Sequence, residues 1–137
     1  MSAFELDPQL AADTVSVADW SLCRVLLMND ANYPWLILVP ARPGLRDLHD
    51  LAPDDLATVT GEIVRASRAL EGLFKPKKLN VAALGNMVPQ LHIHVIARFE
   101  DDPAWPKPVW GVVPAQPCEP DDLEARVAAL RGAFAAA

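Results

Sequence analysis

The amino-acid sequence predicts an α+β fold, in which a mainly antiparallel sheet of about five strands carries one long packed helix and a C-terminal helix. Short apolar runs bounded by turn residues indicate the strands, and hydrophobic residues at three- and four-residue steps indicate the helices. At 137 residues and 52% hydrophobic content, the chain is long enough for one substantial core and too short for two ordinary domains. We therefore expect a single domain over residues 1–137.

Four apolar segments bounded by turn residues are predicted as strands: residues 20–28, 35–39, 79–84 and 91–99. The turn sequence Asn29-Asp30-Ala31-Asn32 separates the first two, so they should pair as a hairpin. A loop containing Gly85, Asn86 and Pro89 joins the last two.

From Pro53 to Phe74, apolar residues recur on one face of a predicted helix, with Asp54 and Asp55 in its first turn, where the helix dipole favours them. Prolines crowd the stretch from Pro103 to Pro120, which excludes helix and predicts an ordered, extended tail beyond the core at residues 20–99. Asp121 is a suitable cap for a last helix. Its apolar stripe would contain Leu123, Val127, Leu130 and Phe134.

The formal net charge of −6 argues against nucleic acid or an anionic membrane as a partner. A small anion stays possible, because a local pocket can bind phosphate whatever the net charge. Neither a secretory leader nor an apolar run of membrane-spanning length is evident, so we expect a cytoplasmic protein. Cys23 and Cys118 are far apart in the sequence and are expected to be free thiols.

The run Gln90-Leu91-His92-Ile93-His94 carries the candidate chemistry, since the two-residue period of a strand places Gln90, His92 and His94 on one face. Imidazoles exist in neutral and protonated forms near neutral pH, so one ring can attack while its neighbour holds a phosphate oxygen. A solvated strand face or a metal site would show the same pattern. A catalytic metal site generally needs a third protein ligand, and the only other histidine is His49, so we expect no metal.

The run from Gln90 to Ile96 resembles the histidine triad (HIT) motif, in which histidines alternate with hydrophobic residues, with Gln90 in place of the first histidine. The resemblance extends to residues 36–40 and 79–81. Beyond the motif, residues 102–106 and 108–111 resemble the tail of a bacterial HIT-like subgroup often labelled as diadenosine tetraphosphate hydrolases, whose members also carry the glutamine. The resemblance to the HIT family implies a HIT-like fold and a homodimer.

The resemblance further implies that His92 attacks the α-phosphorus of a nucleotide to form a nucleotidyl-histidine, which water then hydrolyses. His94 would contact the phosphate oxygens and stabilise their developing charge, without a metal or other cofactor. Asn80 matches an amide near the same phosphate, and Asn29 matches a residue that contacts the ribose.

Gly85 and Asn86 lie in the loop before the motif, where a residue without a β-carbon lets backbone amides approach an anion. Considered without the family, Gly85 is explained equally well as a turn glycine, and Asn86 and Asn29 are explained better as turn residues.

The implied activity is hydrolysis of a nucleotidyl bond, with dinucleoside polyphosphates or adenosine phosphoramidates as substrates. Three positions depart from the family: Pro43, where several relatives have an additional histidine, Gln90 and Met87. Gln90 cannot carry a proton to a leaving group as an imidazolium does, and Met87 replaces a serine or threonine hydroxyl. The rival hypothesis is therefore a nucleotide-binding protein that keeps the pocket and has little or no catalysis.

Overall fold

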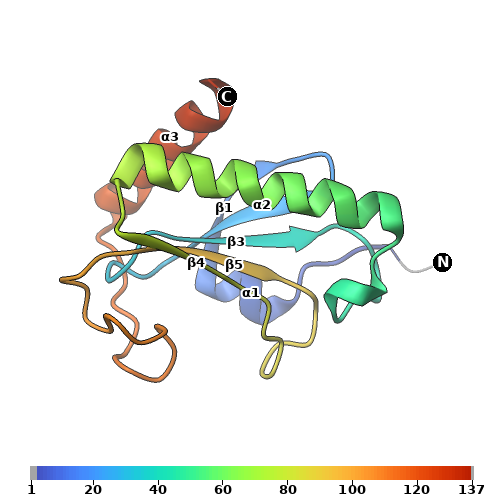
Figure 1. Cartoon of the computed structure of the whole chain (residues 1–137), viewed down its shortest axis with the longest axis horizontal. Coiled ribbons are helices and arrows are strands. Elements are labelled where there is room, and N and C mark those ends of the chain that lie inside the picture. The colour runs from blue at the N-terminus through green and yellow to red at the C-terminus, as the bar shows by residue number, and fades with distance from the viewer. Residues whose placement is uncertain (1–2, 137) are drawn as a thin grey trace.

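A five-stranded antiparallel sheet forms the centre of the computed structural model, which describes residues 3–136 (Figure 1). The strands lie in the order β1-β2-β3-β5-β4, and every neighbouring pair is antiparallel. Their bounds are β1 Thr14–Asp19, β2 Cys23–Met28, β3 Trp35–Pro40, β4 Lys78–Ala82 and β5 Ile93–Arg98. The helices are α1 Pro8–Asp13, α2 Pro53–Phe74 and α3 Pro120–Ala136, with a short 3-10 helix at Leu48–Asp50.

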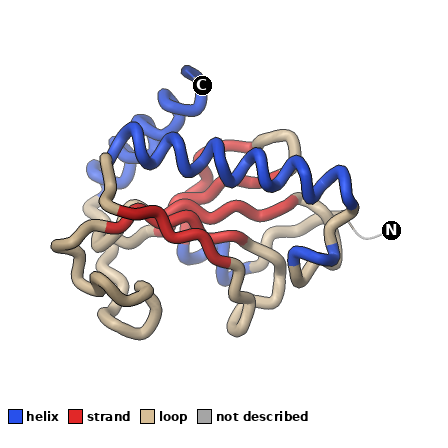
Figure 2. Tube along the Cα trace, in the orientation of Figure 1, coloured by secondary structure: helices blue, strands red, loops and turns tan. Residues whose placement is uncertain are grey.

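Helices α2 and α3 cover one face of the sheet, while α1 and the long loop after β5 lie on the other (Figure 2). Successive side chains of each strand point to opposite faces of the sheet, so each face has its own set of residues. In β5, Ile93, Val95 and Ala97 enter the core beneath the helices. Ile96 enters a second core against the loop, and His94 and Arg98 share its face by strand alternation. The sheet is therefore apolar on the helical side and carries buried polar groups on the other.

The structure confirms the long helix, which begins and ends where its hydrophobic period predicts. The predicted hairpin is β2 paired with β3. The first strand is predicted over residues 20–28, but β2 begins three residues later, at Cys23. The Trp20 N–H donates to the Cys23 carbonyl at 2.9 Å, which closes a turn before the strand. Asp121 lies in the first turn of α3, which begins at Pro120, so its prediction as the cap is wrong. No helix within residues 3–136 combines the length and apolarity needed to cross a lipid bilayer.

Two elements near the N-terminus, α1 and β1, have no counterpart among the predicted segments. The Asp7 side chain accepts a hydrogen bond from the Gln9 N–H and caps α1, whose first residue is Pro8. Proline at a first helical position is favourable, because its missing N–H would have no partner there. Strand β1 pairs with β2 at the edge of the sheet, where its polar Ser16 and Asp19 face solvent.

Arg98, at the end of β5, is 1% exposed and organises the loop that follows. Its guanidinium forms a two-point ion pair with Asp102, at 2.8 and 3.0 Å. It also donates to the Asn80 side-chain oxygen and the Lys107 carbonyl, both at 2.8 Å. Burial alone would raise the pKa of Asp102, but Arg98 and the backbone N–H groups of Phe99 and Trp105 outweigh burial and lower that pKa to about 2. The carboxylate is thus charged at neutral pH.

Replacing Asp102 with alanine is expected to destabilise the protein by about 3–5 kcal/mol, because it leaves a buried guanidinium without its counter-charge. Chemical denaturation measures the change. The control is Asp19→Ala, which removes the exposed partner of Arg24 and should leave the midpoint nearly unchanged. Equal, small effects of both variants would contradict an organising role for Arg98.

Candidate active site

His92 and His94 line a pocket of about 350 Å³ on the face of the sheet opposite α2 and α3. Both rings are almost fully buried, at 6% and 5% exposure, and their centroids are 4.8 Å apart. The walls come from α1, the sheet, the loop between β4 and β5, and the loop after β5. The remaining lining residues are Gln9, Leu10, Asp13, Met28, Ile37, Leu84, Gly85, Asn86, Met87, Val88 and Trp110. The predicted pair of imidazoles therefore faces one cavity.

The His92 ring is oriented by the backbone immediately before it. Its Nδ1 lies 2.7 Å from the Gln90 carbonyl oxygen. A carbonyl can only accept, so Nδ1 carries the proton and neutral His92 has its lone pair on Nε2. This is the protonation state that a nitrogen nucleophile requires.

The His94 ring is held by a side chain from the neighbouring strand. The indole Nε1–H of Trp35 donates to His94 Nδ1 at 3.0 Å. Burial, followed by the charge of nearby His92, lowers the pKa of His94 to about 4. The ring is therefore neutral at physiological pH.

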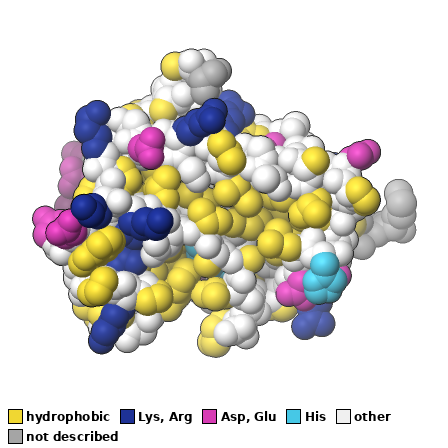
Figure 3. All heavy atoms as spheres, in the orientation of Figure 1, with side chains coloured by type: hydrophobic (Ala, Val, Ile, Leu, Met, Phe, Trp, Pro, Cys, Tyr) yellow, Lys and Arg dark blue, Asp and Glu magenta, His cyan; other side chains and the backbone are white. Residues whose placement is uncertain are grey.

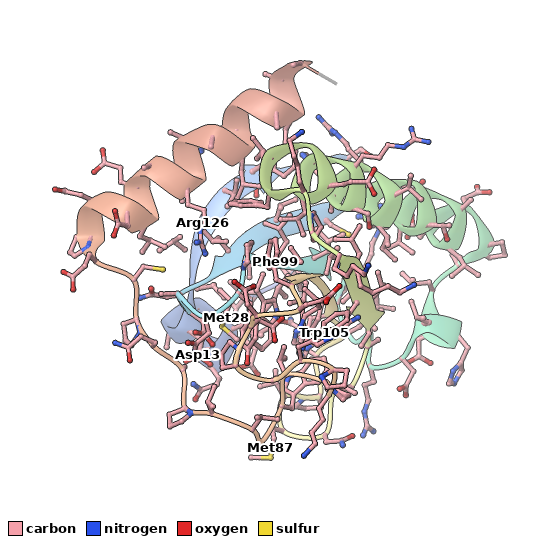
Figure 4. All side chains as sticks on the ribbon, turned by 60° about the vertical axis from the view of Figure 1, so that its left-hand side comes forward. Asp13, Met28, Met87, Phe99, Trp105 and Arg126 are labelled. Atoms are coloured by element: carbon pink, nitrogen blue, oxygen red, sulfur yellow. The ribbon has the colours of Figure 1, made fainter. Side chains whose placement is uncertain are left out.

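Two loops form the rim of the pocket. The Trp110 ring from the loop after β5 packs edge-on against His94, with centroids 5.0 Å apart. From the loop between β4 and β5, Met87 is 93% exposed and lies at the outer edge of the molecule (Figure 4). Asp13 and Met28 also line the pocket; Met28 is half-buried and Asp13 is exposed. Gly85 has φ of +74°, and an added Cβ would meet only the Val88 carbonyl at 3.6 Å. Its backbone conformation, rather than a lack of space, favours glycine there.

Three predicted site residues lie outside the pocket wall, because their side chains serve other segments. The Gln90 side chain accepts from the Asp7 N–H at 2.9 Å and donates to the Glu5 carbonyl at 2.8 Å, which ties the N-terminal segment to the motif. Asn29 accepts from the Cys118 N–H at 2.9 Å, and Asn80 accepts from Arg98. Gly85 and Asn86 do line the pocket.

The sequence patterns missed the contribution of α1. Gln9 and Asp13 both line the pocket, and the Gln9 amide donates to the Asp13 carboxylate at 3.0 Å. The sequence Asp7-Pro8 is a helix-start signal that could have revealed this wall. Asp13 brings a negative charge, and no lysine or arginine of the described residues joins the lining.

The described part of the chain contains no candidate metal-binding cluster. Within residues 3–136, no group of three or more His, Cys, Asp or Glu side chains is placed to hold a metal ion. His49, the third histidine, is 85% exposed at its side chain and lies outside the pocket.

The fold and the paired histidines define a HIT domain protein. The HIT domain model matches residues 9–101, and the chain belongs to this family. HIT domain proteins are generally nucleotide-binding hydrolases or transferases. Among curated proteins, none matches the chain.

Three solved histidine triad proteins are similar over nearly the whole chain. One from Bradyrhizobium japonicum is 46% identical, with a TM-score of 0.95 over 97% of this chain and 99% of that one. Another, from Marinobacter aquaeolei, is 43% identical, with a TM-score of 0.95 over 98% of each chain. A third, from Sinorhizobium meliloti, is 41% identical, with a TM-score of 0.92 over 94% and 96%. The bacterial HIT-like assignment and the five-stranded fold are thereby confirmed.

Replacing Gln90 with alanine is expected to destabilise the protein by about 1–2 kcal/mol, because one partly buried and one exposed hydrogen bond to backbone are lost. Hydrogen exchange of the Asp7 amide should become faster. Gln116→Ala is the matched control, since this exposed glutamine donates its backbone N–H to Asp30. Unchanged exchange at Asp7 would show that Gln90 does not hold the N-terminal segment.

Proposed function

We propose that the protein hydrolyses a nucleotidyl bond at the α-phosphate, through a covalent intermediate on His92. The observation that supports this most is the contact of 2.7 Å between His92 Nδ1 and the Gln90 carbonyl oxygen. With Nδ1–H donated to the Gln90 carbonyl, the lone pair of Nε2 is available for attack at the pocket that His92 lines. The neighbouring His94, which is neutral, stabilises the phosphate oxygens as a hydrogen-bond donor.

The reaction has two steps. In the first, His92 Nε2 forms a bond to the α-phosphorus, and the bond to the leaving group breaks with its electron pair going to that group. In the second, water attacks the phosphorus, the phosphorus–nitrogen bond breaks, and a nucleoside monophosphate is released. The leaving group takes its proton from water, because the Gln90 amide carries no acidic proton and is bound to residues 5 and 7.

The charge of the pocket favours a substrate with few phosphates. A dinucleoside polyphosphate carries several negative charges, whereas Asp13 is acidic and the described lining contributes no lysine or arginine to balance them. An adenosine phosphoramidate carries only one negative charge at its phosphorus. The apolar side chains of Leu10, Met28 and Val88 suit a nucleobase. We therefore propose phosphoramidates as better substrates than dinucleoside polyphosphates.

Rapid quenching of the enzyme with adenylyl-labelled phosphoramidate is expected to leave label on His92 through an acid-labile, base-stable phosphorus–nitrogen bond. His92→Ala should form no adduct and should lower kcat by more than about a thousandfold, because the nucleophile is gone. Turnover of diadenosine tetraphosphate, measured in parallel, should be slower than that of the phosphoramidate.

The matched control is His49→Ala, which removes a histidine outside the pocket and should keep both label and turnover. The competing function is nucleotide binding alone. That alternative holds if wild type and His92→Ala bind AMP equally and neither turns over any substrate in the panel.

A homodimer is the assembly we propose, with a second copy of the chain on β4. This strand is at the edge of the sheet and pairs only with β5 among the described strands. Val81 of β4 and Leu56 of α2 are exposed at 48% and 42%. Hydrophobic side chains gather over the face formed by α2 and β4 in Figure 3. A second copy would satisfy the strand edge and cover this apolar surface. The cytoplasm is the proposed location, since Cys23 and Cys118 are free thiols.

Val81→Glu is expected to convert a dimer into a monomer, because a charge would be buried at the interface between two copies. Light scattering coupled to gel filtration measures the mass. Val112→Glu is the control, since Val112 is exposed at 39% and belongs to the loop after β5 and not to β4 or α2. A wild-type protein that is monomeric throughout the micromolar range would disprove the proposed dimer.

A further inference from the structure

The hydrogen bond between Trp35 and His94 has a chemical direction. An indole nitrogen carries a hydrogen and has no acceptor capacity, so His94 Nδ1 must accept with its lone pair. Neutral His94 then carries its only ring proton on Nε2. His92 has the opposite arrangement, since its proton lies on Nδ1.

The register of the sheet fixes this contact. Trp35 is opposite Ile96, and His94 is opposite Ile37, so Trp35 and His94 are diagonal neighbours on the same face of β3 and β5. Long and aromatic side chains reach each other across such a diagonal.

The indole has little room to turn away from His94. It is 5% exposed and packs edge-on between Tyr33 and Trp110, with centroid distances of 6.2 and 5.9 Å. Removing the bond would therefore leave His94 Nδ1 in a buried place without its donor.

The same bond opposes the two other states of the imidazole. A proton on Nδ1, in either the second neutral tautomer or the imidazolium, would face the indole N–H as donor against donor. Trp35 thus disfavours both states. Nε2–H is then the hydrogen-bond donor of the ring that is available to a ligand in the pocket.

We propose that Trp35 is a positioning residue that sets the tautomer of His94, so that Nε2–H serves as a neutral donor to a phosphate oxygen. The part concerning phosphate rests on the proposed function. The part concerning the tautomer rests on the hydrogen bond alone.

Nitrogen NMR of the ¹⁵N-histidine-labelled full-length protein tests the tautomer without any substrate. In the wild type at neutral pH, His94 should show an unprotonated Nδ1 and a protonated Nε2, and His92 the reverse. In Trp35→Phe, which keeps an aromatic ring and removes the donor, the His94 Nδ1 resonance should move toward the protonated position.

Trp110→Phe is the matched control for the NMR experiment. Trp110 also packs on the His94 ring, through an edge-on aromatic contact, so this variant should leave the His94 tautomer as in the wild type. If Trp35→Phe fails to fold, site-specific replacement of Trp35 by 3-benzothienylalanine removes the N–H while keeping the bicyclic shape.

The kinetic consequence is measured with the adenosine phosphoramidate. Trp35→Phe should lower kcat by about tenfold, which is less than the loss of a whole oxyanion donor, typically on the order of a hundredfold or more. A wild-type His94 protonated on Nδ1, or a Trp35→Phe protein with unchanged His94 resonances, would overturn the proposal. Absence of turnover in the wild type would instead count against the proposed function and leave the tautomer result intact.

Discussion

The buried guanidinium of Arg98 is the constraint on which the site depends. Its donors are shared among Asp102, Asn80 and the Lys107 carbonyl, so strand β4, strand β5 and the loop after β5 meet at one cation. Desolvating an arginine is costly unless its hydrogen bonds are made, and here the loop must fold back to make them. That return of the chain delivers Trp110 to the His94 ring.

Much of the fold could be predicted because periodicity reports on burial. Helix α2 and the hairpin of β2 and β3 follow from their hydrophobic patterns alone. Strand β1 is at the sheet edge, and Val15 and Val17 are its only large apolar residues, so its apolar run is too short to be told from a loop. Helix α1 is too short to show a hydrophobic period. Its sequence signal is limited to the capping residue Asp7 and Pro8 at the first helical position.

The site could be predicted in part, for a similar reason. The two-residue period predicts that His92 and His94 lie together, because residues two apart in an extended chain project to the same side. His92 itself lies just before β5. The partners of Gln90 and Asn29 come from segments 83 and 89 residues away, and no local pattern reports such contacts. Whether these amides and Asn80 act on substrate stays a prediction. The acidic wall formed by Asp13 likewise depends on how α1 folds against the sheet.

Gln90 connects the N-terminal segment to His92, the proposed nucleophile. Its side-chain amide hydrogen-bonds to the backbone of Glu5 and Asp7, and its own backbone carbonyl orients the His92 ring. Removing residues 5–7 would release the amide and loosen the carbonyl that orients the imidazole. A change at the amino end would thereby affect the proposed nucleophile, which is encoded more than eighty positions later.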